Sequence, residues 1–534
     1  MLSSNGILSL PVWISPMIVL SPLLLILLTA TLLWVARKQP IRMQWGLSAA
    51  MALLIWLTTL AVRLGPDRNI QLSVWQPSQM FVSPIGLTLD AITWPITYAV
   101  VTVLVAMVFT SASRGSESTA GVRIFWFLYT GSAILSILAD NLLTVIITWT
   151  FFDFISAIFL FSLLRVDTEI RQVLTRLSID ISGILLILAG TAFSITFGDG
   201  ARFGDISSPL GVSLIALGGF VRLGLLPLHF NLPGLMVIRR GLGTLLRLYP
   251  PAIVLALLAK LFRAGVPDQT LPWFLVAGIS GLVIGGLRWI LESDTVAGRP
   301  FFILCMSGIG IFAVASAPDT YMGLVSAAIT LLLAGAVLSL AEVFTPSHRV
   351  LALGAAIIQL GIPIMPMGIL INTAGNLVKE NLPVSLAAIA ILLGVSFTTL
   401  GSLHTYYAKE IPWRTGESLV RLTFGLGLSL PLFASIGIGL HLRPEVNIWS
   451  WILLGFQVLL VVGGFYILRN LSERDIVRVR FNLSRIDPSA AYTAIAGGIQ
   501  FILAGMKSIA DLIEGEAAIL WIIAITVFLV LASG

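Results

Sequence analysis

The sequence predicts an all-α polytopic membrane protein with about 14–16 transmembrane helices. The composition is the first reason, because 57% of the 534 residues are hydrophobic and only 10% are charged. Soluble domains carry roughly 25% charged residues. The second reason is that apolar runs long enough to cross a bilayer recur from end to end. The longest polar segments are about 20 residues, so we expect no soluble domain of useful size.

The candidate spans follow from a requirement of roughly 20 apolar residues per crossing. A first long run followed by many others reads as a first span and not as a removed signal peptide. We expect spans near 17–36, 45–64, 87–110, 124–139, 141–164, 173–196, 209–226, 234–247, 249–264, 271–291, 300–316, 321–344, 350–371, 384–407, 418–440, 448–469 and 515–533.

One span is predicted to be broken. Residues 234–247 are too short to cross alone, so they are joined with 209–226 into one interrupted span. Pro227 and Pro233 cannot both sit in an undisturbed helix, which places the irregular part near 227–233. The Pro/Gly-rich run GIPIMPMG (361–368) is a candidate counterpart later in the chain. Paired broken helices are typical of membrane folds that carry an ion path.

Basic loops predict the orientation. Clusters that include Arg37, Arg114 and Arg176 follow the first, third and fifth spans, so these alternate loops are expected in the cytoplasm and the N-terminus outside. The loop 65–86 then faces outward. The charged stretch 470–488 is expected to be a cytoplasmic linker before the last spans.

Several function classes are disfavoured by residue content. The single cysteine, Cys305, lies in an apolar run and is expected to be a buried, inert thiol. The four histidines are scattered, so no metal site is expected, and no phosphate-binding glycine loop is present. With one cysteine, no metal cluster and no soluble domain, we expect no bound cofactor. The net charge of +6 lies in loops and reports orientation, so we expect no nucleic-acid partner.

Ionisable residues within spans are costly and are functional candidates by default. Asp153 lies about three turns inside a span, so it must be protonated or paired with a cation. Asp140 and Asn141 open the same span, where either can cap the helix.

Basic residues near the broken span are the next candidates. Arg222 precedes the first proline and His229 lies inside the break, as expected of a hydrated cavity. We expect Arg222 and Arg247 to be buried, and Arg239 and Arg240 to form an ordinary surface loop.

Two further places are read as structural. Lys260 lies late in its span and is expected to reach the membrane surface together with Arg263. The stretch 288–300 is expected to be a connecting loop.

Four motifs, in order, resemble the antiporter-like membrane subunits of respiratory complex I, Mrp-type cation/proton antiporters and membrane-bound hydrogenases. Asp90 in GLTLDAITW falls where that family has "DGLS". ADNLL (139–143) with Trp149 resembles "ADNLL…WE". The last two motifs, RLGLLPLHFNLPGLM (222–236) and QLGIPIMPMG (359–368), resemble "KSAQLPLHTWLPDAM" and "LAGLPPLAGF".

The resemblance implies a 14-helix core of two inverted repeats, each with a broken helix. It divides the chain into N-terminal helices (1–85), an antiporter-like core (86–410) and C-terminal helices (411–534). In that family a Glu–Lys pair in the first half, and Lys or His residues in the second, carry protons across the membrane.

This chain departs from the family at those positions. The family's Glu is Thr150, with Asp153 the nearest carboxylate, and the family's Lys and His match Arg222 and Arg247. The helix 325–342 has no His or Lys, and the later lysine falls near Asn372. Because Arg stays protonated where a dry Lys can release its proton, the family path should not relay protons here. We expect Asp153 to pair with Arg222 as a fixed ion pair.

The resulting prediction is a membrane-arm subunit of a complex I-like (NADH/quinone oxidoreductase) or Mrp-type assembly, serving either a modified ion path or a mainly structural role. The ion-path candidates are Asp153, Arg222, His229, Arg247 and Lys260. As an enzyme it would be at most a subunit, without a catalytic centre of its own. The expected partners are other membrane subunits and the lipid bilayer of a bacterial cell membrane or an energy-transducing organelle. Two alternatives are a free-standing secondary transporter of a small solute or ion, and a module of an inorganic-carbon or hydrogenase system.

Overall fold

The computed structural model describes residues 14–63, 68–72, 84–113, 119–163, 167–197, 200–226, 240–292, 295–341, 346–378, 382–407, 418–442, 447–470 and 505. Apart from one small hairpin, the described chain is helical, as predicted. The helices of the first part are α1 (Ile14–Val35), α2 (Ile41–Val62), α3 (Thr93–Thr110), α4 (Ala120–Leu138), α5 (Leu142–Leu163), α6 (Asp167–Thr196), α7 (Pro209–Leu223) and α8 (Arg240–Ala264). Those of the later part are α9 (Leu271–Ser280), α10 (Gly286–Leu291), α11 (Thr295–Ser316), α12 (Met322–Leu340), α13 (Pro346–Gln359), α14 (Met367–Leu377), α15 (Leu382–Tyr407), α16 (Ser418–Leu442) and α17 (Ile448–Asn470).

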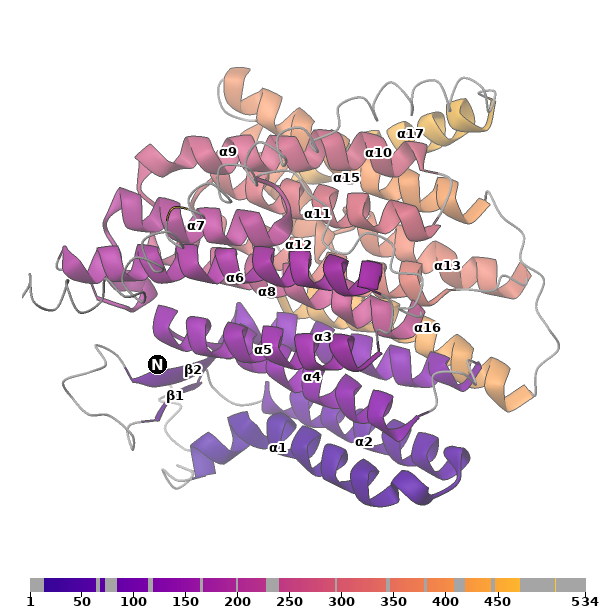
Figure 1. Cartoon of the computed structure of the whole chain (residues 1–534). Coiled ribbons are helices and arrows are strands. Elements are labelled where there is room, and N and C mark those ends of the chain that lie inside the picture. The colour runs from indigo at the N-terminus through magenta and orange to yellow at the C-terminus, as the bar shows by residue number, and fades with distance from the viewer. Residues whose placement is uncertain are drawn as a thin grey trace, which may run out of the picture. The chain divides into compact units, whose positions relative to one another are not determined.

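Thirteen helical segments of the described chain are long and apolar enough to cross a membrane, so this is a multi-pass membrane protein. These helices lie side by side along one common direction (Figure 1). The central pair is α8 and α12, whose apolar stretches are buried along their whole length, whereas α17 is mostly exposed. Helices α8 and α12 therefore form the core around which the other described helices pack.

The first predicted break is present. Helix α7 ends at Leu223 because Gly224 adopts a left-handed conformation with φ 77°, and the next described helix, α8, begins at Arg240. The two prolines on which the prediction rests lie outside the described residues.

The predicted division of residues 234–264 into two segments is wrong, because α8 runs without interruption through Pro250 and Pro251. A proline has no N–H, so Pro250 leaves the carbonyl of Leu246 without its helical donor. Arg176 Nη2 of α6 donates to that carbonyl at 3.3 Å. A neighbouring helix thus supplies the hydrogen bond that the proline removes, which is how membrane helices tolerate such residues.

The second predicted break is also present. Helix α13 ends at Gln359 and α14 begins at Met367, with an irregular connection between them. The run of glycine and prolines at 361–366 explains the interruption, since Pro363 and Pro366 cannot donate to a helical ladder.

A two-stranded hairpin was not foreseen. Strands β1 (Arg68–Leu72) and β2 (Ile85–Leu89) pair antiparallel, with Arg68 opposite Leu89 and Leu72 opposite Ile85. The hairpin lies at one end of the helices (Figure 1), where β2 packs against α4 and α5. It forms part of the loop that was expected to face outward, and it positions polar groups at that end of the bundle.

Glycines set the closest helix contact in the later part. Helices α9 and α10 are joined by a π-helical turn, Gly281–Gly285, which packs against α11. A Cβ added at Gly281 would lie 3.0 Å from Gly308 Cα, so the two backbones touch directly. Cys305 of α11 is buried in this contact, as predicted.

Candidate functional site

Four buried charges form a cluster in the first half of the bundle. Its members come from α5, α6 and α7, and we call them the four-charge cluster: Asp153, Arg176, Asp180 and Arg222. Arg222 binds Asp153 with both arms of its guanidinium, at 2.7 Å (Nη1 to Oδ2) and 2.8 Å (Nη2 to Oδ1). The predicted ion pair between these residues is therefore present, in the strong bidentate geometry.

Close packing of α6 against α7 brings Arg222 to this position. A Cβ on Gly183 of α6 would fall 2.9 Å from the carbonyl oxygen of Gly218 and 2.5 Å from Arg222 Cγ. Only a glycine leaves room for the arginine to cross α6. Arg222 then also donates from Nη1 to the Asp180 carbonyl at 2.9 Å, so one guanidinium joins three helices.

Asp180 was missed at the sequence level, and Arg176 was misread as a cytoplasmic loop charge. Both lie on α6, are less than 8% exposed, and pair at 3.4 Å across one helical turn. The i,i+4 spacing inside a predicted span was the available signal. With both included, the cluster contains two acids and two bases and is formally neutral.

Aromatic rings surround the cluster. The Arg222 guanidinium lies 4.7 Å from the centre of the Trp149 ring, a cation–π distance. Tyr129 of α4 stacks on Phe152, next to Asp153, with ring centres 4.5 Å apart. A small cavity of about 10 Å³ opens between Asp153, Arg176 and Asp180, with room for at most about one water molecule.

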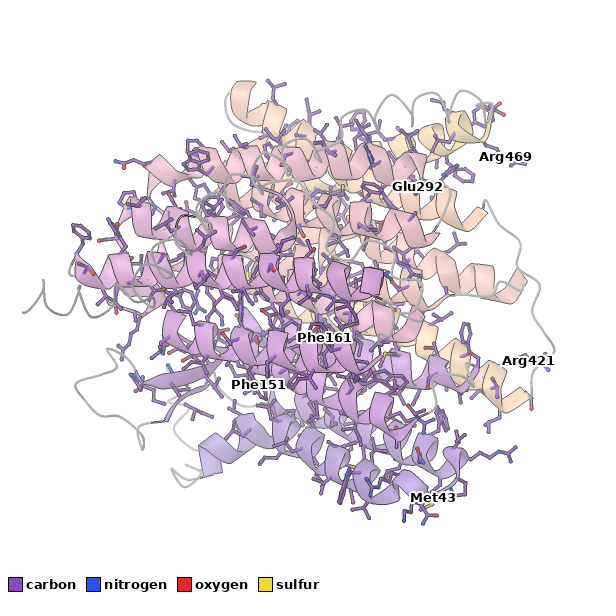
Figure 2. The ribbon with its side chains drawn as sticks, viewed as in Figure 1. Met43, Phe151, Phe161, Glu292, Arg421 and Arg469 are labelled. Carbon is purple, nitrogen blue, oxygen red and sulfur yellow. The ribbon has the colours of Figure 1, made fainter. Side chains whose placement is uncertain are left out.

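Thr150, at the position of the family's glutamate, lies on the exposed side of α5, one turn before Asp153. Its side chain is exposed and donates only to the Ile146 carbonyl at 2.7 Å. Phe151 and Phe161, both labelled in Figure 2, are also exposed on α5, 48% and 39% respectively. Asp153, and not residue 150, therefore faces the interior cation.

Buried arginines continue from the cluster toward the centre. Arg176 reaches the Leu246 carbonyl, beside Arg247, which is buried as predicted. Arg247 and Arg299 line one cavity of about 10 Å³ against α12. Arg299 Nη2 donates to the Ser339 carbonyl at 3.1 Å. The interpretation of 288–300 as a loop is therefore wrong, because 288–291 belong to α10 and 295–300 to α11, where Arg299 is helical and buried.

The central helix α12 offers these arginines no titratable partner. Its sequence, MGLVSAAITLLLAGAVLSL, contains no acidic or basic side chain. Its polar contributions are hydroxyls and backbone, for example Ser326 Oγ, which donates to the Pro366 carbonyl. The sequence analysis predicted that this helix has no His or Lys, and the structure places the helix at the centre of the bundle.

Lys260 does not reach the surface, so that prediction is wrong. Its side chain is 4% exposed, and Nζ donates to the carbonyls of Ile137, at 2.6 Å, and Ala139. These carbonyls belong to the C-terminal end of α4, where the helix dipole favours a cation. Lys260 is held there as a helix cap.

Asp140 and Asn141 have different roles at the start of α5. Asn141 Oδ1 accepts from the backbone N–H of Thr144 at 2.9 Å and is the cap. Asp140 instead binds the hairpin, accepting from Thr88 Oγ1 at 2.7 Å and from Asn69 Nδ2 at 3.1 Å.

A second acid–base contact lies at the same end of the bundle. Asp90, between β2 and α3, accepts from the backbone N–H of Thr93 at 2.9 Å and forms an ion pair with Arg263, which is 40% exposed. Burial opposes ionisation of Asp90, but the Thr93 hydrogen bond and the Arg263 charge outweigh it and hold the pKa of this carboxyl below its ordinary value.

The second broken helix is held by neutral groups. Gln359, the last residue of α13, exchanges hydrogen bonds with Ser402 at 2.9 and 3.1 Å. Gln457 of α17 accepts from the Gly361 N–H at 2.9 Å and donates to the Gln359 carbonyl at 3.3 Å. Asn372, where the family has a lysine, accepts from Ser450 Oγ at 2.8 Å.

The structure joins two of the five ion-path candidates. Asp153 and Arg222 are in contact. Arg247 is next in sequence to Leu246, whose carbonyl accepts a hydrogen bond from Arg176, and Lys260 lies apart at the end of α4. His229 lies outside the described residues.

Comparison with known proteins shows the fold. No family model matches the sequence, and no curated protein matches it. A chain of the Mrp complex from Dietzia sp. DQ12-45-1b superposes with a TM-score of 0.70 at 15% identity, covering 96% of this chain and 63% of that one. A chain of the membrane-bound sulfane sulfur reductase, an archaeal respiratory membrane complex, superposes with a TM-score of 0.65 at 15% identity, covering 97% and 99%. The chain thus has the fold of these membrane-complex chains, and spans under two thirds of the length of the first.

The four-charge cluster predicts a non-additive mutant cycle. Asp153→Asn leaves one buried positive charge without compensation and should destabilise the protein by about 3–5 kcal/mol. The double variant Asp153→Leu/Arg222→Met leaves the neutral Arg176–Asp180 pair and should recover most of that loss. Thermal unfolding in detergent measures both, with Thr150→Val on the exposed side of α5 as the matched control. A double variant no more stable than Asp153→Asn would contradict this account.

Proposed function

We propose that this chain is a membrane subunit of a multi-subunit assembly of the Mrp or respiratory-complex type, in which its buried charges form a fixed framework and do not relay protons. The shared fold supports the first part, because both chains compared above are parts of larger membrane complexes. The redox chemistry of such an assembly would then reside on other chains.

The bidentate Asp153–Arg222 pair is the observation that carries the second part. A guanidinium stays protonated under physiological conditions, so it cannot pass a proton on as a desolvated lysine can. Asp153 has both oxygens engaged by that permanent cation. Neither member of the pair is then free to change its charge during transport.

The buried arginines beyond the four-charge cluster lead to the same conclusion. Arg176, Arg247 and Arg299 follow one another toward α12, and α12 provides no titratable group beyond them. A relay needs groups that accept and release protons in turn. These arginines instead hold buried helices together, because Arg176 binds a carbonyl of α8 and Arg299 binds a carbonyl of α12.

The location follows from the assembly. Such a subunit belongs in the cell membrane of a bacterium or in an energy-transducing organelle membrane, with other membrane subunits and lipid around it. A link to NADH or quinone chemistry would come through those partners.

Co-migration tests the assembly. Extracted in a mild detergent from its native membrane, the chain should migrate in blue native gels well above the size expected for a 57.4 kDa monomer with bound detergent. Mass spectrometry of the band should identify further membrane proteins in constant ratio. A monodisperse monomer that by itself transports a solute in liposomes would instead establish a free-standing transporter.

Proton flux tests the fixed framework. Reconstituted alone in liposomes under an imposed potential, the wild-type chain should acidify the lumen no faster than protein-free liposomes. Arg222→Lys should not create conductance, because the centre of the bundle still lacks a titratable group on α12.

The informative comparison in that assay is Asp153→Asn. Wild-type conductance that Asp153→Asn abolishes, while the exposed control Thr150→Val retains it, would show that Asp153 has replaced the missing glutamate. The framework proposal would then be wrong, while membership of an assembly would stand.

A further inference from the structure

A separate cavity opens at the end of the bundle that carries the hairpin. It has a volume of about 260 Å³ and lies between β2, the start of α5, the α6–α7 connection and the end of α8. Three of its lining side chains are cationic, namely Arg202, Lys260 and Arg263. This cavity is distinct from the four-charge cluster, none of whose members lines it.

The cations come from separate segments and are fixed in different ways. Lys260 is 4% exposed, reaches the pocket from α8, and has its ammonium anchored by two carbonyls and set 5.9 Å from the Phe203 ring centre. Arg263 is oriented by Asp90. Arg202 is exposed, and its backbone is held by an isolated antiparallel bridge to Asn141.

The nearby carboxylates are already occupied. Asp140 lines the pocket, but its two oxygens accept hydrogen bonds from Thr88 and Asn69. Asp90 accepts from the backbone of Ile92 and Thr93 through one oxygen and from Arg263 through the other. Among the side chains that line the pocket, three cations face one carboxylate, Asp140, so the lining carries an excess of positive charge around a concave, partly enclosed space, where the field of like charges is focused.

We propose that this pocket binds a phosphate-type oxyanion. Guanidinium forks from Arg202 and Arg263 match the geometry of such a group, and the Lys260 ammonium, anchored by two carbonyls, adds a third cationic donor. The hydrogen-bonded Asp140 and Thr88 complete the lining, and the volume of about 260 Å³ limits the ligand to a small headgroup or free ion. Nothing in the fixed-framework account requires this site.

The same chemistry is available from two sources. The pocket lies where α4 and α8 end, at the level where a bilayer gives way to water, so an anionic lipid phosphate can reach it. A free phosphate ion from the aqueous side would meet the same cations.

The test uses the full chain purified in detergent, with Arg202→Gln as the variant because Arg202 is exposed. Lys38→Gln, an exposed cation following α1, is the matched control. In one arm, inorganic phosphate is titrated at constant ionic strength and the unfolding temperature is followed. In the other, native mass spectrometry counts retained phosphatidylglycerol against phosphatidylcholine.

In either arm, wild type and Lys38→Gln should bind alike, and Arg202→Gln should weaken binding by about tenfold, the loss expected for one charge-assisted contact. Saturable stabilisation by phosphate identifies the free ion as ligand, and selective phosphatidylglycerol retention identifies the lipid. Equal behaviour of wild type and Arg202→Gln in both arms overturns the proposal. Lys260→Met should reproduce the loss where it folds.

Discussion

The bidentate contact between Arg222 and Asp153 is the constraint on which the first half of this protein depends. An unpaired carboxylate or guanidinium at membrane depth costs several kcal/mol, so neither residue could occupy its helix alone. Arg222 lies in the last turn of α7, just before the left-handed Gly224, and the contact requires a glycine at residue 183 so that the side chain can cross α6. It also fixes the face of α5 that turns inward, which leaves Thr150 outside.

The two halves meet the same structural problem with different chemistry. Each contains helical backbone groups, freed by a proline within a helix or by a break between helices, that need partners in a medium without water. In the first half, permanent cations bind the carbonyls, as Arg176 does at the position exposed by Pro250. In the second half, the amides of Gln359 and Gln457 close the break, with α17 supplying one of them. A bundle built this way is held together by its polar interior, and titratable groups are not needed for that role.

Sequence reasoning succeeded where the cost of burial leaves few choices. The Asp153–Arg222 pair follows from charges inside apolar runs, and the second helix break follows from the prolines at 363 and 366. It failed where a partner is a backbone atom, because the carbonyls of Ile137 and Ala139 that bind Lys260 leave no trace in the residue types. It also failed for Arg176, which a charge-counting rule assigned to a loop although Asp180 lay one turn away. Contacts such as Gln359 with Ser402 join residues distant in sequence, so only the fold reveals them.

The central claim is that Asp153 keeps one charge state in the membrane, and infrared difference spectroscopy of the reconstituted protein tests it most directly. Spectra are recorded from mildly acidic to mildly alkaline pH for the wild type and for Asp153→Asn. The account predicts no protonated carboxyl C=O band that titrates in the wild type and is missing in the variant, because Arg222 holds the carboxylate throughout. A titrating carboxyl band that disappears in Asp153→Asn would contradict it and identify Asp153 as a proton carrier.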